Sequence, residues 1–307
     1  MIRRSHIHGI MSKYFRRCRT IVAALLTMLS CAVAARAQSP GGAESPAGDL
    51  NAAQARAFEL KEPLMLLITE TDGSRGDERA RTVIGSRAVR ALGDGVVRFT
   101  LDLAVSRNRA TAARFHVAAT PVLLFLSPHG IILSRDETNI SRHLVMQRID
   151  EAGIRGLELD ARLAALQEAA DRDTNDVAAV FHLTDFLVAH GNDLDAIPHL
   201  SAIAHSGNFS TADRIRAWVA LARAHLWIAE PEKGRHEAND LIATLGPVAP
   251  EARAGGNLVL GLQDATAKRT ALAKQEFEDA VAAAPNSPYG KEAAAALAKL
   301  AQGRAVK

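Results

Sequence analysis

The stretch that decides the fold is ATPVLLFLSPHG, residues 119–130. Its apolar run, residues 122–126, is too short for a helix and lies between turn-forming residues, which is typical of a strand buried on both faces. The Ser-Pro-His-Gly that follows predicts a tight turn with Gly130 at positive φ, leading into an antiparallel partner strand at 131–133. Proline cannot donate a ladder hydrogen bond, so it fits the start of this strand, where a cis Thr120–Pro121 bond is tolerated.

Helical and strand patterns alternate over residues 49–155. Besides the hairpin, the pattern predicts strands at 64–68 and 96–101 and helices at 49–61, 77–92, 104–115 and 141–152. Such alternation indicates a partly parallel sheet with right-handed crossovers, to which the terminal hairpin adds antiparallel strands. The expected class of this region is therefore α/β.

Three segments of this region resemble thioredoxin. ARFHVAATP at 113–121 looks like the end of a helix followed by the cis-proline loop of that family, and LLFLSPHG at 123–130 looks like the hairpin after it. VIGSRAV at 83–89 is similar to the segment that follows the active-site helix in exported thioredoxin-like proteins. The resemblance covers about residues 50–155 and implies a thioredoxin-like domain at 49–155.

The chain departs from that family at its redox centre. Thioredoxins carry a Cys-x-x-Cys pair at the N-terminus of the first long helix, where the helix dipole lowers a thiol pKa. Counting back from Val83, the corresponding residues here are Gly73, Ser74, Arg75 and Gly76, and none is a thiol. We therefore expect a loop and helix cap in place of a redox centre. A nucleophilic role for the Ser74 hydroxyl would need a positioned base, and no histidine is near in sequence.

Residues 156–307 are helical in pattern almost to the end, and they repeat. Three sets of small or apolar residues at i, i+4 and i+7 follow one another at intervals of 38 and 39 residues: Ala196, Leu200, Ile203; Gly234, Ala238, Leu241; Ala273, Phe277, Ala280. Fifteen residues before each set stands an apolar residue of the first helix of the pair: Phe181, Val219 and Leu258.

The last repeat looks most like a tetratricopeptide repeat (TPR), although the period exceeds that family's usual ~34 residues. A polar-faced helix at about 287–301 is expected to cap the array. The expected fold is thus an α/β thioredoxin-like domain (49–155) plus an all-α TPR-like helical repeat domain (156–307).

The first 37 residues are typical of a signal peptide. Basic residues without acids precede an apolar stretch at 20–29, and Ala35-Arg36-Ala37 offers a small-x-small cleavage site before Gln38. Residues 38–48 have the composition of a linker. Two alternatives stay open: the apolar stretch could anchor the chain in a membrane, or MLSC at 28–31 could serve as a lipoprotein signal that leaves Cys31 lipidated.

Removal of this segment changes the charge and the redox chemistry. Residues 1–37 hold seven of the 37 lysines and arginines and none of the 34 acidic residues, so the processed chain carries 30 basic residues and a net charge of −4. That balance offers no basic surface for nucleic acid. Both cysteines, Cys18 and Cys31, are also removed, so no disulfide and no thiol chemistry are expected.

Other candidate sites are weaker. Nine histidines follow the signal segment, six of them in the repeats (His182, His190, His199, His205, His225, His236), but no His-x-x-x-His pair with a carboxylate third ligand is present. We interpret them as solvated or core residues and expect no metal or other cofactor. Residues 73–76 could hold an anion at a helix N-terminus, but they lack the Lys-Ser/Thr of a phosphate-binding loop.

These patterns predict a non-catalytic periplasmic or secreted protein that binds a protein or peptide, as an adaptor or holdase. The expected docking edge comprises Gly73, Ser74, Arg75, Gly76, Thr120 and Pro121, because the Thr120 backbone can pair with an extended chain. In a second interpretation the protein is a structural or lipid-anchored scaffold subunit of a cell-envelope complex, and contacts a membrane only through Cys31. The repeats could also simply stabilise the first domain or dimerise. In a third interpretation the protein is an enzyme that uses Ser74 or a histidine-bound metal.

Overall fold

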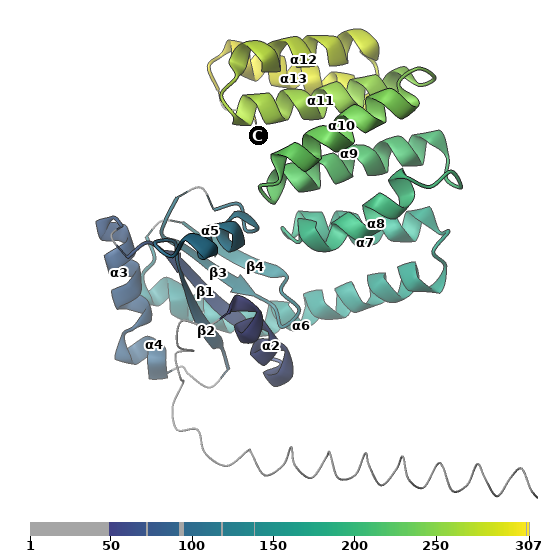
Figure 1. The fold of residues 1–307 in the computed structure, drawn as a ribbon. Coiled ribbons are helices and arrows are strands. Elements are labelled where there is room, and N and C mark those ends of the chain that lie inside the picture. Colours follow the sequence, from purple (N-terminus) through teal and green to yellow (C-terminus); the bar gives the residue numbers. More distant parts are fainter. Residues whose placement is uncertain are drawn as a thin grey trace, which may run out of the picture. The chain divides into compact units, whose positions relative to one another are not determined.

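The computed structural model describes residues 49–71, 73–91, 95–117, 119–137, 139–304 and 306. The predicted signal peptide and linker, with Cys18 and Cys31, lie outside the described residues. The described residues all belong to one compact unit. They form a four-stranded mixed sheet followed by a helical region (Figure 1).

The sheet has the strand order β2-β1-β3-β4. β1 (Leu64–Thr69) pairs in parallel with β2 (Val97–Asp102) and antiparallel with β3 (Val122–Leu126), and β3 pairs antiparallel with β4 (Ile132–Asp136). The predicted parallel portion and the terminal hairpin are both present. Gly130 has a φ of 85°, and the Thr120–Pro121 bond is cis, as the opening stretch of sequence indicated.

Helices cover both faces of the sheet, which explains why β1 and β3 are apolar without alternation. Leu66 and Leu124 belong to the core on one face, with residues of α2 (Leu50–Leu60) and α5 (Ser106–Ala113). Met65 and Phe125 belong to the core on the other face, with residues of α3 (Arg75–Ile84), α4 (Arg87–Ala91) and α6 (Arg142–Arg172). Every residue of β1 and β3 is buried.

The helix predicted at 77–92 is in fact two helices. α3 ends at Ile84, and the N–H of Gly85 still donates to the Arg81 carbonyl. Ser86 then starts a new turn, because its hydroxyl accepts a hydrogen bond from the N–H of Val89 at 3.4 Å. The prediction of one continuous helix was wrong because a side-chain cap at Ser86 competes locally with continuation.

α6 is 31 residues long, so the predicted end near Ala152 was also wrong. Its buried positions continue past that residue through Gly156, Asp160 and Leu163, at helical spacing. A Cβ at Gly156 would lie 3.5 Å from Leu133 Cδ1, an ordinary contact, so the helix passes close over the sheet without a break. α6 therefore runs through residue 155, where the sequence placed the domain boundary, and packs on β3, β4 and the next helix.

Three helix pairs and a final helix follow (Figure 1). One residue with positive φ stands in the turn of each pair: Gly191 at 70°, Ala229 at 61° and Lys268 at 60°. These turns are spaced 38 and 39 residues apart, the same intervals as the predicted apolar sets. The helices are α7 (Val177–Ala189) with α8 (Asp193–Ala204), α9 (Thr211–Trp227) with α10 (Pro231–Leu245), α11 (Pro250–Thr266) with α12 (Thr270–Ala283), and α13 (Pro288–Ala301).

The predicted repeat residues form the core of this region. Phe181, Val219 and Leu258 are buried on the first helices of the pairs, and all nine residues of the three sets are buried on the second helices. α13 begins after Ser287, whose hydroxyl accepts from the N–H of Gly290, and it packs on α11 and α12. The helical region and its internal period are therefore confirmed.

Candidate functional site

The candidate site is built at the N-terminus of α3. Ser74 is the N-cap of this helix, and its hydroxyl accepts a hydrogen bond from the N–H of Asp77 at 3.4 Å. The Asp77 carboxylate reciprocates by accepting from the N–H of Ser74 at 3.0 Å. This reciprocal pair is a capping box, which fixes the start of the helix and the course of the loop before it.

Asp77 is the centre of the site, although the sequence interpretation did not select it. Its side chain is only 1% exposed, and a buried carboxylate needs hydrogen bonds to offset the loss of water. Four donors supply them: the N–H of Glu70 at 3.2 Å, the N–H and the hydroxyl of Ser74 at 3.0 Å each, and the Thr120 hydroxyl at 3.2 Å. The Ser-x-x-Asp spacing was the signal that could have identified this residue.

The cis-proline loop closes the site from the other side. Thr120 reaches Asp77 through its hydroxyl, and Pro121 packs against Gly76, where a Cβ would lie 3.2 Å from Pro121 Cδ. Gly73 is just as constrained, since a Cβ there would lie 2.4 Å from an Asp77 carboxylate oxygen. The structure thus brings together five of the six residues that the sequence proposed. The sixth, Arg75, is exposed at the first position of α3.

The backbone of Thr120 is the unused part of the site. The pairing between β1 and β3 begins one residue after Pro121, at Val122 opposite Ile68. Within the described residues, no hydrogen bond engages the Thr120 N–H or carbonyl; only its side chain is bonded. The residues around it at 73–76 are exposed.

The hydroxyl of Ser74 is committed to the cap. It donates to the Asp77 carboxylate and accepts from the Asp77 N–H, and no histidine of the described residues bonds to it. The group that accepts its proton in this hydrogen bond is the Asp77 carboxylate, which also accepts from Glu70 N–H, Ser74 N–H and the Thr120 hydroxyl. These hydrogen bonds fix the position of the loop before α3.

Asp102 at the end of β2 holds the loop that precedes the site. Its carboxylate accepts hydrogen bonds from the Thr71 hydroxyl, from the Thr71 N–H at 3.0 Å and from the Ala104 N–H at 3.0 Å. Burial by itself would raise the pKa of Asp102, but these hydrogen bonds outweigh it, with a smaller contribution from Arg81, and hold the pKa below its usual value.

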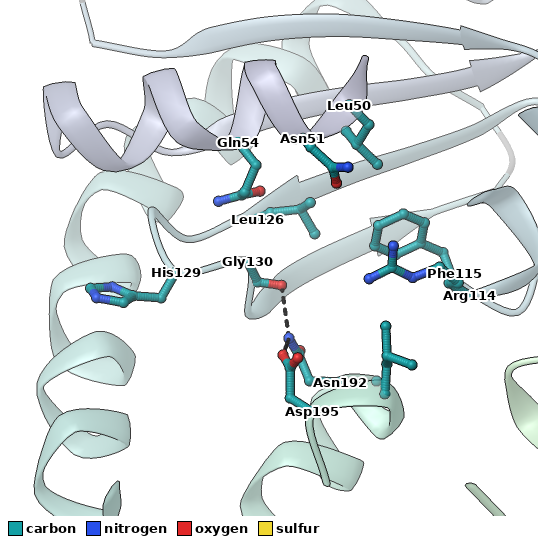
Figure 2. A pocket seen from close by; sticks show the side chains of 12 residues that line it. Leu50, Asn51, Gln54, Arg114, Phe115, Leu126, His129, Gly130, Asn192 and Asp195 are labelled. Carbon is teal, nitrogen blue, oxygen red and sulfur yellow. Dashed lines mark hydrogen bonds between the residues drawn. The ribbon is translucent and has the colours of Figure 1, made fainter. Parts of the chain in front are cut away.

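A small pocket lies elsewhere, between α2, the β3–β4 turn and the start of α8 (Figure 2). Its volume is about 150 Å³, below the roughly 300–1,000 Å³ of typical ligand sites. Two of its amide side chains are bonded within the chain. Gln54 Nε2 donates to the carbonyls of Ser127 and Pro128. Asn192 Nδ2 donates to the carbonyl of Gly130 at 3.3 Å (Figure 2). We interpret this pocket as part of the packing contact between α8 and the β3–β4 turn.

Five histidines of the described residues each lie within 4 Å of one carboxylate, and the three shortest distances involve His116, His129 and His225. His116 lies 3.3 Å from Asp193, His129 lies 2.9 Å from Asp160, and His225 lies 3.0 Å from Glu230. Within the described ranges, no three His, Cys, Asp or Glu side chains come together in a way that could hold a metal ion.

Comparison with protein-family models and with curated protein sequences finds no match to this chain. Among the helices of the described part, none combines the length and the apolar character needed to cross a bilayer.

Proposed function

We propose that this protein is a non-catalytic binding protein, an adaptor or holdase for an extended peptide or an unfolded chain. In this proposal a thioredoxin-like domain without its redox pair is joined to TPR-like repeats. The observation that carries it is the Thr120 backbone, which forms no hydrogen bond with another described residue and is held beside the exposed loop 73–76 by the buried carboxylate of Asp77.

Counting back from Val83 placed the two cysteine positions of thioredoxin at Gly73 and Gly76. We propose instead that they correspond to Ser74 and Asp77, one residue later in the chain. Ser74 and Asp77 stand at the N-cap and the third position of α3, and their side chains touch at 3.0 Å, as the two members of a Cys-x-x-Cys pair must. Gly73 and Gly76 offer no side chains to form such a pair. In this assignment a hydroxyl and a carboxylate occupy the positions of the two thiols. They hold the loop through hydrogen bonds and transfer no electrons.

The proposed binding mode is addition of a strand at Thr120. An extended peptide can use the N–H and the carbonyl of this residue, and backbone pairing tolerates many side chains because it does not read them. The exposed loop 73–76 would form one wall beside the peptide, with Arg75 at its rim. Such tolerance suits a holdase or an adaptor with several partners.

The helix pairs supply a second surface in the same proposal. Stacked helix pairs of nearly constant period bury a continuous core and form an extended concave surface, which such arrays use for binding. Arg216 on α9 is on the surface of this region, with half of its side chain exposed, and lies 3.9 Å from the centroid of the Phe181 ring. A partner that engages both surfaces would gain affinity through the two contacts together.

The proposal includes export, on the strength of the N-terminal sequence. The basic segment, the apolar stretch and the Ala35-Arg36-Ala37 site support cleavage before Gln38. Mass spectrometry of the natural N-terminus tests this point: an end at Gln38 supports a free exported protein, whereas an acylated Cys31 would favour the scaffold of an envelope complex.

Site-specific crosslinking tests the binding function. A photoreactive amino acid is placed at Ala119, next to Thr120, at Arg216 on α9, and at Glu59 on α2 as an exposed control. We expect a chemically unfolded model protein to crosslink at Ala119, to be displaced by an extended peptide, and to aggregate less when this protein is present. Labelling at Ala119 no stronger than at Glu59, together with unchanged aggregation, would contradict the proposal.

A further inference from the structure

The start of α8 contains a buried carboxylate without a hydrogen bond. Asp193, the first residue of this helix, is 1% exposed, and neither of its carboxylate oxygens accepts a hydrogen bond from a described residue. Its place at the positive end of the helix dipole favours the ionised form. Because burial of an ionised carboxylate without hydrogen bonds is costly, this side chain depends on a countercharge.

The partner that the structure supplies is an imidazole from the sheet region. His116 Nε2 lies 3.3 Å from Asp193 Oδ2, in the loop that leads from α5 to Thr120. The two groups are close, but their geometry makes no hydrogen bond. A neutral imidazole therefore does little for this carboxylate, whereas an imidazolium supplies the countercharge. Imidazole is the side chain that ordinarily gains or loses its proton between about pH 5 and 8.

His116 connects three parts of the fold. Its backbone, with a φ of 54°, is held by Arg135 of β4, which donates to the carbonyls of Phe115 and His116. Its ring lies 5.7 Å from the ring of Trp227 at the end of α9. The side chain is 35% exposed, so a proton can reach it from solvent. One imidazole thus links the loop before Thr120 to both α8 and α9.

The other ionisable groups of the segments that meet here have positions or partners of their own. They are Arg114 in the same loop, Arg135 on β4, His190 after α7, Asp195 on α8, and His225 and Glu230 near the end of α9. Arg114 is exposed, Arg135 is paired with Glu137, and Asp195 accepts from the Asn192 amide. Of these groups, the two imidazoles belong to the type that titrates in the same pH range. His190 packs against Phe186, and His225 lies 3.0 Å from Glu230.

We propose that the proton on His116 controls the contact between the cis-proline loop and the helix pairs. With the proton bound, the imidazolium is the counter-ion of Asp193 and the loop is held against α8. When the pH rises and the proton leaves, the buried carboxylate loses its countercharge, water enters the contact, and the loop separates from α8. The contact is closed at about pH 5 and opens towards about pH 8. This inference rests on the geometry of the contact and is independent of the proposed function.

NMR titration of the His116 ring tests the charge pairing. We expect this imidazole to lose its proton at a pH at least about half a unit higher in the unmodified chain than in Asp193→Asn, because the ionised carboxylate stabilises the imidazolium. His143, which is exposed on α6 and has no ion pair within the described residues, is the internal reference and should titrate equally in both proteins. An equal midpoint for His116 in the two proteins would overturn the proposal.

Spin-label distances test the opening itself, in a chain whose Cys18 and Cys31 are replaced by serine. Ala110→Cys on α5 and Ala212→Cys on α9 place one label on each region at exposed positions. We expect a single narrow distance at about pH 5 and its loss, in favour of longer and broader distances, at about pH 8. The same distribution at both pH values would overturn the proposal, whatever the ring titration shows.

Three variants assign the response to this contact. His116→Asn suits the positive φ but cannot bind the proton, so it should be open at both pH values. Asp193→Asn removes the charge that needs a counter-ion and should be closed at both. His225→Gln is the matched control and should respond to pH as the unmodified chain does. A response that persists in His116→Asn, or that disappears in His225→Gln, would overturn the assignment to His116.

Discussion

Two buried aspartates, one in each region of the molecule, are held in opposite ways. Asp77 and Asp193 are both 1% exposed. Asp77 accepts four hydrogen bonds from its own loop and from Thr120. Asp193, at the start of α8, has no hydrogen bond to either carboxylate oxygen among the described residues, and the one ionisable partner that they offer within 4 Å is His116, whose Nε2 lies 3.3 Å away in the loop after α5.

Asp77 is therefore part of a local structure, whereas Asp193 is part of a contact between segments that are distant in sequence. The sheet region satisfies Asp77 with residues that belong to the site itself, so the site is formed wherever that region is folded. Asp193 instead depends on a histidine from the sheet region, whose ring also lies 5.7 Å from that of Trp227 at the end of α9. We infer that the proposed docking site is internally stable, whereas the contact between the sheet and the helix pairs is the more easily altered feature.

The largest expected effect comes from emptying the core of either region. Phe125 in β3 and Phe277 in α12 are both 0% exposed, so Phe125→Ala and Phe277→Ala should each cost about 3–5 kcal/mol of unfolding free energy. Because α6 packs on both the sheet and α7, we expect one denaturation transition in each variant, followed by circular dichroism in urea. Two separated transitions would show that the regions unfold independently.

Replacement of Asp77 tests whether the site is held locally. Asp77→Ala leaves four donors without their acceptor and should cost about 3 kcal/mol. Asp77→Asn keeps one carbonyl oxygen and should cost roughly half as much. Both values come from urea denaturation. A loss below about 0.5 kcal/mol for the alanine variant would mean that the network does not hold the loop.

Replacement of the His116–Asp193 pair should have a smaller effect, and the order of the variants is informative. His116→Ala removes the imidazole beside the buried Asp193 carboxylate and should cost about 1–2 kcal/mol, a value reduced because the His116 side chain is 35% exposed. Asp193→Asn removes the buried charge itself and should cost less than about 1 kcal/mol. The double variant should be more stable than His116→Ala alone. Simple additivity of the two single effects would contradict coupling between them.

The smallest effect concerns pH. Hydrogen bonds hold the pKa of Asp102 below its usual value against the opposing effect of burial, so its contribution to stability is present above the unfolded pKa of about 3.9 and is lost as pH falls through the lower folded value. Thr71→Ala should therefore lower the melting temperature more at pH 7 than at about pH 3, below the unfolded pKa, where this contribution is smaller. An equal loss at both pH values would assign the role of Thr71 to packing.

Local chemistry made much of the fold predictable from the sequence. The apolar run at 122–126, the turn at Gly130 and the helix starts near residues 49 and 287 each depend on a few neighbouring residues, and the structure has them where the sequence placed them. The repeat period was predictable for the same reason, since it needs only a constant spacing of small and apolar residues.

Features that depend on contacts distant in sequence could not be predicted. The length of α6 depends on its packing against Leu133 and α7. From the sequence alone, Gly153 and Gly156 indicate the end of a helix and give no sign of this packing. The role of Asp77 depends on Thr120, 43 residues away, and that of His116 on Asp193. The six proposed site residues were chosen by analogy with a redox loop, and the carboxylate that organises five of them was not among them.

Hydrogen exchange at the amide of Thr120, followed by NMR with and without a saturating extended peptide, tests the central claim most directly. The account predicts that this amide exchanges at least about tenfold more slowly when the peptide is bound, because its N–H becomes a strand hydrogen bond. Exchange at Glu59 on α2 should not change. A peptide that binds while the Thr120 amide keeps its exchange rate would contradict the account.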